Sequence, residues 1–463
     1  MFRQCLALLS LLALALPARA AERPNVVFLC SDDQRSDTIR ALGNPVIETP
    51  NLDRMVGTGF AFTHAFCMGS MQGAVCVPSR AMFLSGRSLF RINEQLRGIP
   101  TWPETFRKAG YRTVGIGKWH NGPASYAKSF DAGGPIFFGG MGDQNRVNHY
   151  AFDPDGKYPK ANLKVGSEYS TTMFADAAVD FLSGYRGEKP FFLYVTFTVP
   201  HDPRTPPKGY ENKYDPAKLP LPRNYKPRHP FNNGEMLVRD EKLLGWPRTE
   251  AEIRTALANY YAMITHLDAE VGRIVGTLER TGRAKNTVVI FTSDHGLAIG
   301  SHGLLGKQNL YEHSMRPPLL LTGPGIPAGK RSDALVYLFD IFPTACELCG
   351  VTPPAGVEGK SLVSVMAGRQ DKVRDVVFGA YRQFQRSVRT DRWKLIRYPH
   401  INHTQLFDLK ADPDELHDLA KDPAFADKVR EMTKLLEAQQ KAYGDTLPLS
   451  TDKPAPFEIE LKK

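Results

Sequence analysis

The sequence predicts an α/β fold in which helices cover a central sheet of buried, largely parallel strands. Two unbroken apolar runs, residues 25–30 and 287–292, have the length of buried strands and end in polar residues. A segment from Glu252 to Arg280 carries apolar residues at helical spacing. Because strand and helix patterns alternate along the chain, we expect a layered α/β sandwich.

The first twenty of the 463 residues have the pattern of a signal peptide. Arg3 precedes an apolar run that ends at Leu16, and Ala18 and Ala20 fit a cleavage site. The run is shorter than the roughly 20 residues that span a bilayer, and no later segment is apolar for that length. We expect residues 1–20 to be removed and the mature protein to be exported, periplasmic or secreted, without a membrane anchor.

The chain after residue 20 is longer than one compact core usually holds, so a large and a small domain are expected. Near residue 371 the pattern changes to short β-rich runs followed by a helix: 376–381, 387–390, 393–398 and 424–443. We therefore expect a catalytic domain at residues 21–370, and a C-terminal subdomain at 371–463 made of a small antiparallel sheet with one helix. Residues 203–247 are rich in Pro, Asn, Lys and Arg without periodicity, which predicts a surface insertion that rims a cleft.

The formal charge of +10 suits an anionic substrate, a nucleic acid or an anionic membrane equally. The sequence contains no Lys/Arg run interleaved with aromatic residues, so we expect no nucleic-acid partner. The six cysteines are too few and too irregular for a disulfide framework. Cys346 and Cys349 lie in an expected helix, and without a thioredoxin-like context buried apolar roles are favoured over a redox pair.

Four expected strands end in residues that can bind or catalyse: 25–30, 113–116, 191–198 and 287–292. In open α/β sheets ligands bind outside the carboxyl ends of the strands, so these ends should meet in one cleft. Three of the residues there are carboxylates, Asp32, Asp33 and Asp294. A lone Asp at such a position more often caps a helix. Three together, one of them beside His295, repel one another unless a cation lies among them, and oxygen ligands favour calcium or magnesium.

The segment that begins at Cys76 carries the most specific signal. Pro78 fits the first turn of a helix, which places Cys76 just before the positive end of that helix, where anions are favoured. A thiolate is a poor match for a metal held by oxygen ligands, because thiolates prefer softer metals. The mismatch disappears if the thiol is converted to an oxygen nucleophile.

The segment Cys76-Val77-Pro78-Ser79-Arg80 resembles the signature of the type I sulfatases, whose cysteine is oxidised to formylglycine. Other segments look like blocks of that family in the family's order: Asp32-Asp33, Gly117-Lys118-Trp119-His120, Ser293-Asp294-His295-Gly296, Gly303-Leu304-Leu305-Gly306-Lys307, and Leu406-Phe407-Asp408-Leu409. His295 stands where the arylsulfatase branch has Asn and is similar to the iduronate-sulfatase-like branch. Ser85 stands where the family often has Thr.

The resemblance implies an alkaline-phosphatase-like sandwich with a large central mixed sheet and a small C-terminal sheet. It implies one Ca²⁺, held by Asp32, Asp33, Asp294, His295 and the formylglycine derived from Cys76. It also implies a maturase that recognises the segment around Cys76 before folding. The expected substrate is a sulfated carbohydrate such as a glycosaminoglycan or algal polysaccharide fragment.

The resemblance also implies roles for the remaining site residues. A hydroxyl of the hydrated formylglycine would attack sulfur while Arg80 orients the hydrate, and Lys118 and Lys307 would neutralise the sulfuryl oxygens. For an isolated lysine, a solvated surface position is the usual alternative.

Two histidines complete the implied site. His201 would protonate the leaving alcohol, and His120 would take a proton from the second hydroxyl so that sulfate is expelled. The alternative for His201 is a structural role in a Pro-flanked turn.

Two other functions are compatible with the motifs. A phosphate or phosphonate monoester hydrolase of the same superfamily would share the sheet and the metal position, and a much higher kcat/KM for a phosphonate would indicate it. A non-catalytic carbohydrate-binding relative would be indicated by inactivity after maturation of Cys76.

Overall fold

The computed structural model describes residues 23–461. The predicted signal peptide at residues 1–20 lies outside this range. Within the range, no helix combines the length and the apolar content that crossing a bilayer requires.

The main sheet of the described chain has eight strands in the order β12-β2-β11-β10-β1-β9-β5-β6. Their bounds in that order are Lys330–Ser332, Phe60–Phe62, Leu319–Thr322, Thr287–Ser293, Asn25–Ser31, Phe191–Thr196, Arg112–Lys118 and Ala132–Phe137. β10, β1, β9 and β5 are adjacent and mutually parallel, which confirms the four strands expected from the sequence. β11 pairs antiparallel with both β10 and β2, so the sheet is mixed.

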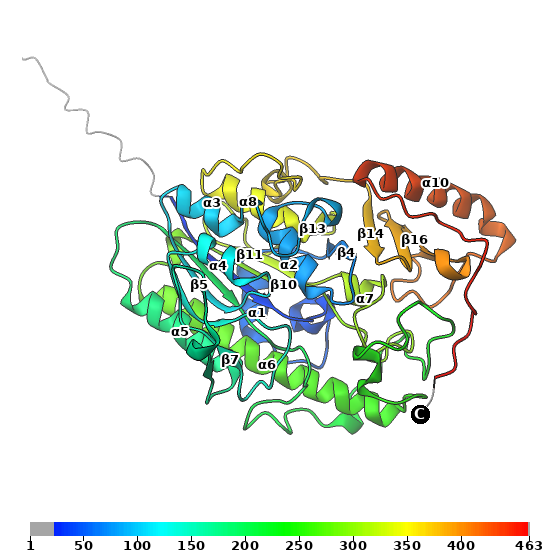
Figure 1. Ribbon diagram of the computed structural model, residues 1–463, viewed down its shortest axis with the longest axis horizontal. Helices are drawn as coiled ribbons and strands as arrows, with labels where there is room; N and C mark the ends of the chain where they lie inside the picture. The colour runs from blue at the N-terminus through cyan, green and yellow to red at the C-terminus, as the bar shows by residue number, and fades with distance from the viewer. Residues whose placement is uncertain (1–22, 462–463) are drawn as a thin grey trace, which may run out of the picture.

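Helices cover both faces of this sheet (Figure 1). One face packs against α1 (Pro50–Thr58), α5 (Ser170–Gly184) and α6 (Glu250–Arg280), and the other against α2 (Cys76–Ser85), α3 (Trp102–Lys108), α4 (Pro123–Ser129) and α8 (Ile341–Leu348). The predicted helix at 252–280 is therefore confirmed, with its start two residues earlier. It begins there because Thr249 and Glu252 form a capping box.

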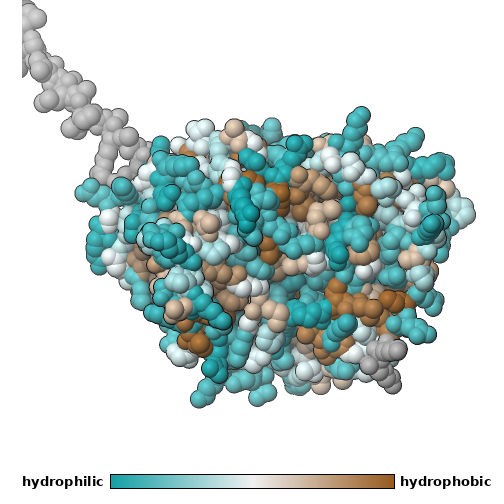
Figure 2. All heavy atoms as spheres, in the orientation of Figure 1, coloured by the Kyte–Doolittle hydropathy of each residue, from teal (hydrophilic) through white to brown (hydrophobic). Residues whose placement is uncertain are grey.

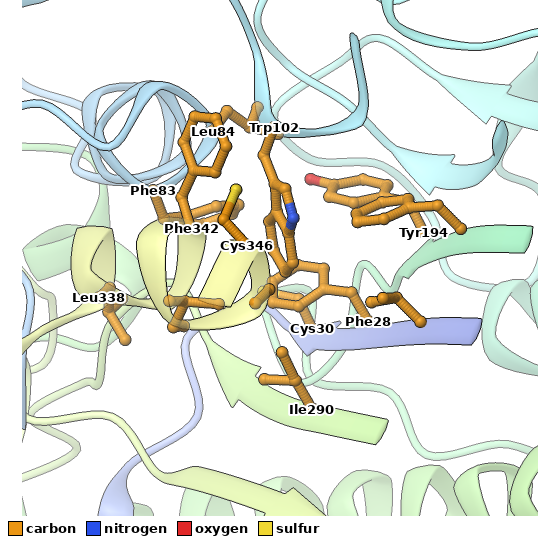
Figure 3. Packing of buried hydrophobic residues seen from close by; sticks show 14 of the residues in the cluster. Phe28, Cys30, Phe83, Leu84, Trp102, Tyr194, Ile290, Leu338, Phe342 and Cys346 are labelled. Carbon is orange, nitrogen blue, oxygen red and sulfur yellow. The ribbon is translucent and has the colours of Figure 1, made fainter. Parts of the chain in front are cut away.

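The core beneath α3 and α8 is rich in aromatic side chains (Figure 3). Phe28 of β1 lies edge-on to Trp102 with ring centroids 5.0 Å apart, and stacks with Tyr194 of β9 at 5.3 Å. Cys346 of α8 belongs to the same cluster, and burial raises its pKa to about 12. Within the described range Cys346 and Cys349 are both free and buried, in line with the apolar role expected for them.

The smaller sheet has five strands in the described chain, in the order β17-β16-β15-β14-β4. The bounds are His403–Asp408, Trp393–Tyr398, Gln385–Arg389, Val377–Tyr381 and Gly69–Ser70, and α10 (Ala426–Tyr443) packs on the sheet. Three strands and the helix match the prediction, whereas β17 and β4 were not predicted. β4 runs parallel to β14, and a Cβ on Gly69 would lie 2.0 Å from the Ala380 carbonyl oxygen, so only glycine fits there.

Because β4 precedes Cys76 by a few residues, the smaller sheet is connected directly to the segment that carries the sulfatase-like signature. The remaining short elements are β3 (Ala65–Phe66), β7 (Asn148–His149), β8 (Lys164–Val165), β13 (Val336–Tyr337), α7 (Glu312–Met315) and α9 (Val363–Met366). The domain boundary near residue 371 stays a prediction.

The insertion at residues 203–247 is irregular, as expected. Its regular structure consists of short 3₁₀ turns at Pro216–Lys218 and Asp240–Leu243 and a single β-bridge between Tyr225 and Ser301. The face of the molecule drawn in Figure 2 is mostly hydrophilic, with apolar residues in small groups.

Buried neutral histidines make the fold sensitive to mild acid. Burial lowers the pKa of His229 to about 3 and, with nearby Arg389 and Arg316, that of His64 to about 4. Unfolding restores a pKa near 6.5, so the unfolded chain binds more protons below that pH. We expect this contribution to the free energy of unfolding to be fully present above pH 6.5 and to decrease as the pH falls from 6.5 to 5. Urea denaturation at each pH measures it. The replacement His229→Gln should flatten this dependence, and equal stability of the wild type at pH 7.5 and 5 would contradict it.

Candidate active site

The strand ends meet as the sequence predicts. Asp32 and Asp33 follow β1, Lys118 ends β5, His201 follows β9, and Asp294 follows β10. A register shift between Gly115 and Gly117 marks an irregularity in β5 just before Lys118. Asp33 and His120 both adopt positive φ, at 69° and 68°, which is uncommon for residues other than glycine.

Cys76 is the first residue of α2, and its thiol lies at the centre of the cluster. His295 Nε2 is 3.2 Å and Lys307 Nζ 3.3 Å from Cys76 Sγ. Although Lys307 opposes it, burial raises the pKa of the Cys76 thiol well above its usual range. An unmodified thiol here is protonated at neutral pH and a weak nucleophile.

Each buried carboxylate of the cluster has a cationic partner. Lys118 Nζ donates to Asp32. Lys307 Nζ donates to Asp33 at 2.8 Å and 3.0 Å from its two oxygens. Burial opposes ionisation, but Lys307, His201 and His295 lower the pKa of Asp33 to about 2.

Arg80 is the cationic partner of the third carboxylate, Asp294. Its Nε donates to Asp294 Oδ2 at 3.1 Å, and its Nη1 donates to the Lys118 carbonyl oxygen at 2.9 Å. Both side chains of the pair are fully buried. The expected repulsion among three carboxylates is therefore offset by the protein's own cations, and it does not by itself require a metal. Both lysines are buried, so the surface alternative is wrong for them.

The donor set nonetheless fits a metal ion. Ligand atoms of Asp32, Cys76, Asp294 and His295 all lie within 4.8 Å of one another. Asp32 Oδ1 is buried without a hydrogen-bond partner in the described chain. His295 Nδ1 lies 2.9 Å from the Gly296 carbonyl oxygen, and a proton held there leaves Nε2 free to coordinate. With an oxygen in place of the sulfur at position 76, this is a set of hard ligands and one imidazole.

A second group of ligand atoms overlaps the first. It consists of Asp33, Cys76 and His201. His201 Nδ1 lies 2.8 Å from the Asp202 carbonyl oxygen, and its Nε2 lies 3.8 Å from Asp33 Oδ2. The contact with the neighbouring carbonyl fixes the ring so that Nε2 faces the cluster.

His120 lines the same pocket as Cys76, next to Gly140. Burial, reinforced by the charges of Lys118 and Arg80, lowers the pKa of His120 to about 2, so its ring is neutral at neutral pH. A Cβ on Gly140 would lie 2.9 Å from this ring, and the Gly140 carbonyl oxygen accepts from Lys118 Nζ at 2.6 Å. Because glycine has no side chain, the loop at Gly140 can pack directly against His120 and Lys118.

A pocket of about 350 Å³ opens onto these groups. It is lined by Gly73, Ala74, Cys76, His120, Gly140, Met141, His201, Val238, Arg239, Asp240, Lys307 and Gln308. Three of these, Val238, Arg239 and Asp240, come from the insertion that was expected to rim the cleft. None of the three was predicted individually, and neither were Met141 and Gln308, because no sequence motif marks these residues. Ser79, also missed as a single residue, donates to the Asp294 carbonyl oxygen at 2.6 Å.

The chain matches two family models. Residues 24–351 match the sulfatase family, and residues 300–442 match the C-terminal region of N-sulphoglucosamine sulphohydrolase. The chain is similar to an N-acetylglucosamine-6-O-sulfatase of Bacteroides thetaiotaomicron, at 27% identity over 96% of this chain and 91% of that protein. It is also similar to an arylsulfatase of Clostridium perfringens, at 28% identity over 91% and 96% of the two chains.

Solved structures share the fold. One, determined in complex with its substrate D-glucosamine-2-N,6-O-disulfate, aligns with a TM-score of 0.78 and 26% identity over 92% of this chain and 99% of that one. A phosphonate monoester hydrolase of Agrobacterium radiobacter aligns with a TM-score of 0.71 at 22% identity, covering 91% and 96% of the chains. At that identity the second likeness shows the fold alone. A place in the iduronate-sulfatase-like branch stays a prediction.

Proposed function

Since the chain belongs to the sulfatase family of sulfuric ester hydrolases, we propose that it removes sulfate from a sulfated carbohydrate with a formylglycine at position 76 and a calcium ion. One observation carries the proposal. The side chain at position 76 lies at a helix N-terminus in the floor of the pocket, within 3.3 Å of both His295 and Lys307. Oxidation of the thiol to an aldehyde, which hydrates in water, would supply an oxygen nucleophile at this position.

Asp32, Asp33, Asp294 and His295 would hold the metal, together with the oxygen at position 76. When bound, the ion would lower the pKa of that oxygen and attract the sulfate group. Calcium is favoured because three of the protein ligands are carboxylates. Asp33 and Asp294 are held in the ionised form that such a site requires, since nearby cations outweigh burial and lower the pKa of each.

The cations of the pocket would bind the sulfuryl group. Lys307 Nζ reaches the side chain at position 76, so it would also lie next to the oxygens of a sulfate bound there. Lys118 is buried against Asp32 and the Gly140 carbonyl oxygen and would add a second positive charge near the sulfate. As charge spreads over the sulfuryl oxygens in the transition state, these fixed ammonium groups need no reorganisation. Arg80 would position the reacting side chain through Asp294.

The two histidines would move protons. His201 lines the pocket with Nδ1 held by the Asp202 carbonyl oxygen, so its Nε2 would give a proton to the leaving alcohol. His120 is neutral and its Nδ1 is buried without a partner among residues 23–461, so a ring nitrogen is free to accept a proton. It would accept the proton whose removal returns the aldehyde and expels sulfate.

The carbohydrate substrate is supported by relatives. The Bacteroides relative is named for N-acetylglucosamine 6-O-sulfate, and the solved relative carries a glucosamine disulfate as its substrate. Export and maturation complete the proposal, since a maturase would have to act on the Cys76 segment before α2 folds and buries it.

Metal removal tests the proposal. We expect treatment of the mature protein with a calcium chelator to abolish sulfate release from N-acetylglucosamine 6-sulfate, and added Ca²⁺ to restore it. The release is measured as free sulfate, with a phosphonate monoester assayed in parallel under the same conditions. Activity that resists complete removal of metal would contradict the metal site. A much higher kcat/KM for the phosphonate would contradict the sulfatase activity.

A further inference from the structure

The mouth of the pocket carries an arginine whose hydrogen-bonding capacity is already used. Arg239 Nη1 lies 2.5 Å from Asp202 Oδ2 and 2.8 Å from Met141 Sδ. Its Nη2 lies 3.1 Å from Asp202 Oδ1 and 2.5 Å from Asp240 Oδ1. The two Nη atoms carry four hydrogens in total, and the four contacts give each of these hydrogens an acceptor. Only the Nε–H of Arg239 has no acceptor among these contacts. Arg239 therefore cannot bind an anion with both arms without breaking an ion pair.

The other cations near the pocket are engaged in the same way. Lys307 pairs with Asp33 and Lys118 pairs with Asp32, and all four side chains are buried. Arg382, beside the insertion, donates to Glu235 Oε1 at 2.6 Å. Among the described residues that line the pocket, the one arginine is Arg239 and the one lysine is Lys307, and each is paired with a carboxylate.

The rim also carries negative charge. Asp240 is almost fully buried, and although burial opposes it, Lys307, Gln308 and Arg239 lower its pKa, so it is ionised. Gln308 Nε2 donates to Asp240 Oδ2 at 2.8 Å. Each carboxylate oxygen has a second lone pair, which can accept from a sugar hydroxyl. A second sulfate or a carboxylate at this place would face Asp240 and a guanidinium, that of Arg239, whose charge is already shared between Asp202 and Asp240.

The rim also has apolar side chains. Met141 and Val238 line the pocket; Met141 is 47% exposed, and Leu237, which precedes Val238 in the chain, is 49% exposed. Apolar side chains of this kind suit the C–H face of a sugar ring and cannot compensate the desolvation of a charge. The volume of about 350 Å³ lies at the small end of ligand sites, so one sugar unit fills it.

We propose that the Asp202–Arg239–Asp240 rim makes this pocket selective for a sugar whose only anionic group in the pocket is the scissile sulfate. Asp240 accepts a hydrogen bond from a hydroxyl of the sugar, Met141 and Leu237 contact its apolar face, and a second sulfate on the same sugar is rejected. The inference rests on the proposed function and specifies its substrate class.

The test compares two sugars that differ by one sulfate group. We expect the mature protein to hydrolyse N-acetylglucosamine 6-sulfate with a kcat/KM about tenfold or more above that for glucosamine 2-N,6-O-disulfate. In Asp240→Asn the ratio should fall by about tenfold, because one negative charge is lost and Arg239 gains a free donor. The variant Met141→Arg adds a cation at an exposed rim position and should shift the ratio in the same direction. The control is Asp427→Asn, an exposed carboxylate on α10, which should keep the wild-type ratio.

The ratio separates selectivity from damage, since a general loss of catalysis lowers both rates together. Equal rates on the two sugars, or faster hydrolysis of the disulfate by the wild type, would overturn the inference and leave the sulfatase function standing. An unchanged ratio in both rim variants would overturn the assignment to this rim. Hydrolysis of neither sugar by protein that carries formylglycine would contradict the carbohydrate function and the inference together.

Discussion

The variant Cys76→Ala is expected to lose sulfate release by roughly 10⁴- to 10⁶-fold in kcat, the range in which enzymes respond to loss of a nucleophile. The reason is geometric. His295 and Lys307 both point at the side chain of position 76, and alanine offers no atom that could be oxidised or could attack. Stopped assays of free sulfate on the purified variant measure the effect.

The matched control is Cys346→Ala. This cysteine of α8 is also buried, but it packs in the aromatic core (Figure 3) and does not line the pocket. We expect its kcat to match that of the wild type, with only a small loss of stability for the cavity created. If Cys76→Ala retained activity within tenfold of the wild type, position 76 would not be the nucleophile.

The second large effect is expected on stability. Replacing Arg80 by methionine keeps much of the volume but removes the partner of Asp294, and both side chains are fully buried. Breaking such a pair typically costs about 3–5 kcal/mol, because a carboxylate is left buried without its counter-charge. The free energy of unfolding, from urea titration of the metal-free protein, should fall by that amount, and the kcat of the metal-loaded protein should fall as well.

An exposed ion pair provides the comparison. Arg54 and Glu279 lie 3.1 Å apart with side chains 43% and 52% exposed. The variant Arg54→Met should lose at most about 1 kcal/mol and no activity, because water screens the pair. A loss for Arg80→Met no larger than that for Arg54→Met would show that the buried pair is not required.

The sequence predicted the helices and strands whose pattern is visible within one short segment of the chain. The strands at the centre of the main sheet are buried on both faces, so each appears in the sequence as an unbroken apolar run. α6 was recognisable because its apolar residues recur with a period of 3.6 residues. β4 could not be found in this way, since a two-residue strand of Gly69 and Ser70 has no apolar pattern and forms by pairing with a distant strand. β17 was missed because its first residues, His403 to Gln405, are polar.

The residues of the candidate site likewise fall into those that the sequence marks and those that it does not. The residues at strand ends and in the Cys76 segment were recognisable because a motif or a strand end marks each of them. The rim residues were not recognisable, because they lie in an insertion without periodicity. Arg239 is placed by its ion pair with Asp202, and Asp240 by its hydrogen bond from Gln308. The sequence also does not show that Lys118, Lys307 and Arg80 each reach a carboxylate. These cations offset the repulsion from which a metal was expected.

The central claim, that the residue at position 76 acts as a formylglycine, is tested most directly by mass spectrometry of the peptide that contains it. The protein is produced in a host with a formylglycine-generating maturase, and its sulfate release is assayed on the same sample. We predict that the peptide has the mass of an aldehyde in place of the CH₂SH group, and that activity rises in proportion to the fraction converted. Full activity in protein whose Cys76 remains an unmodified thiol would contradict the account.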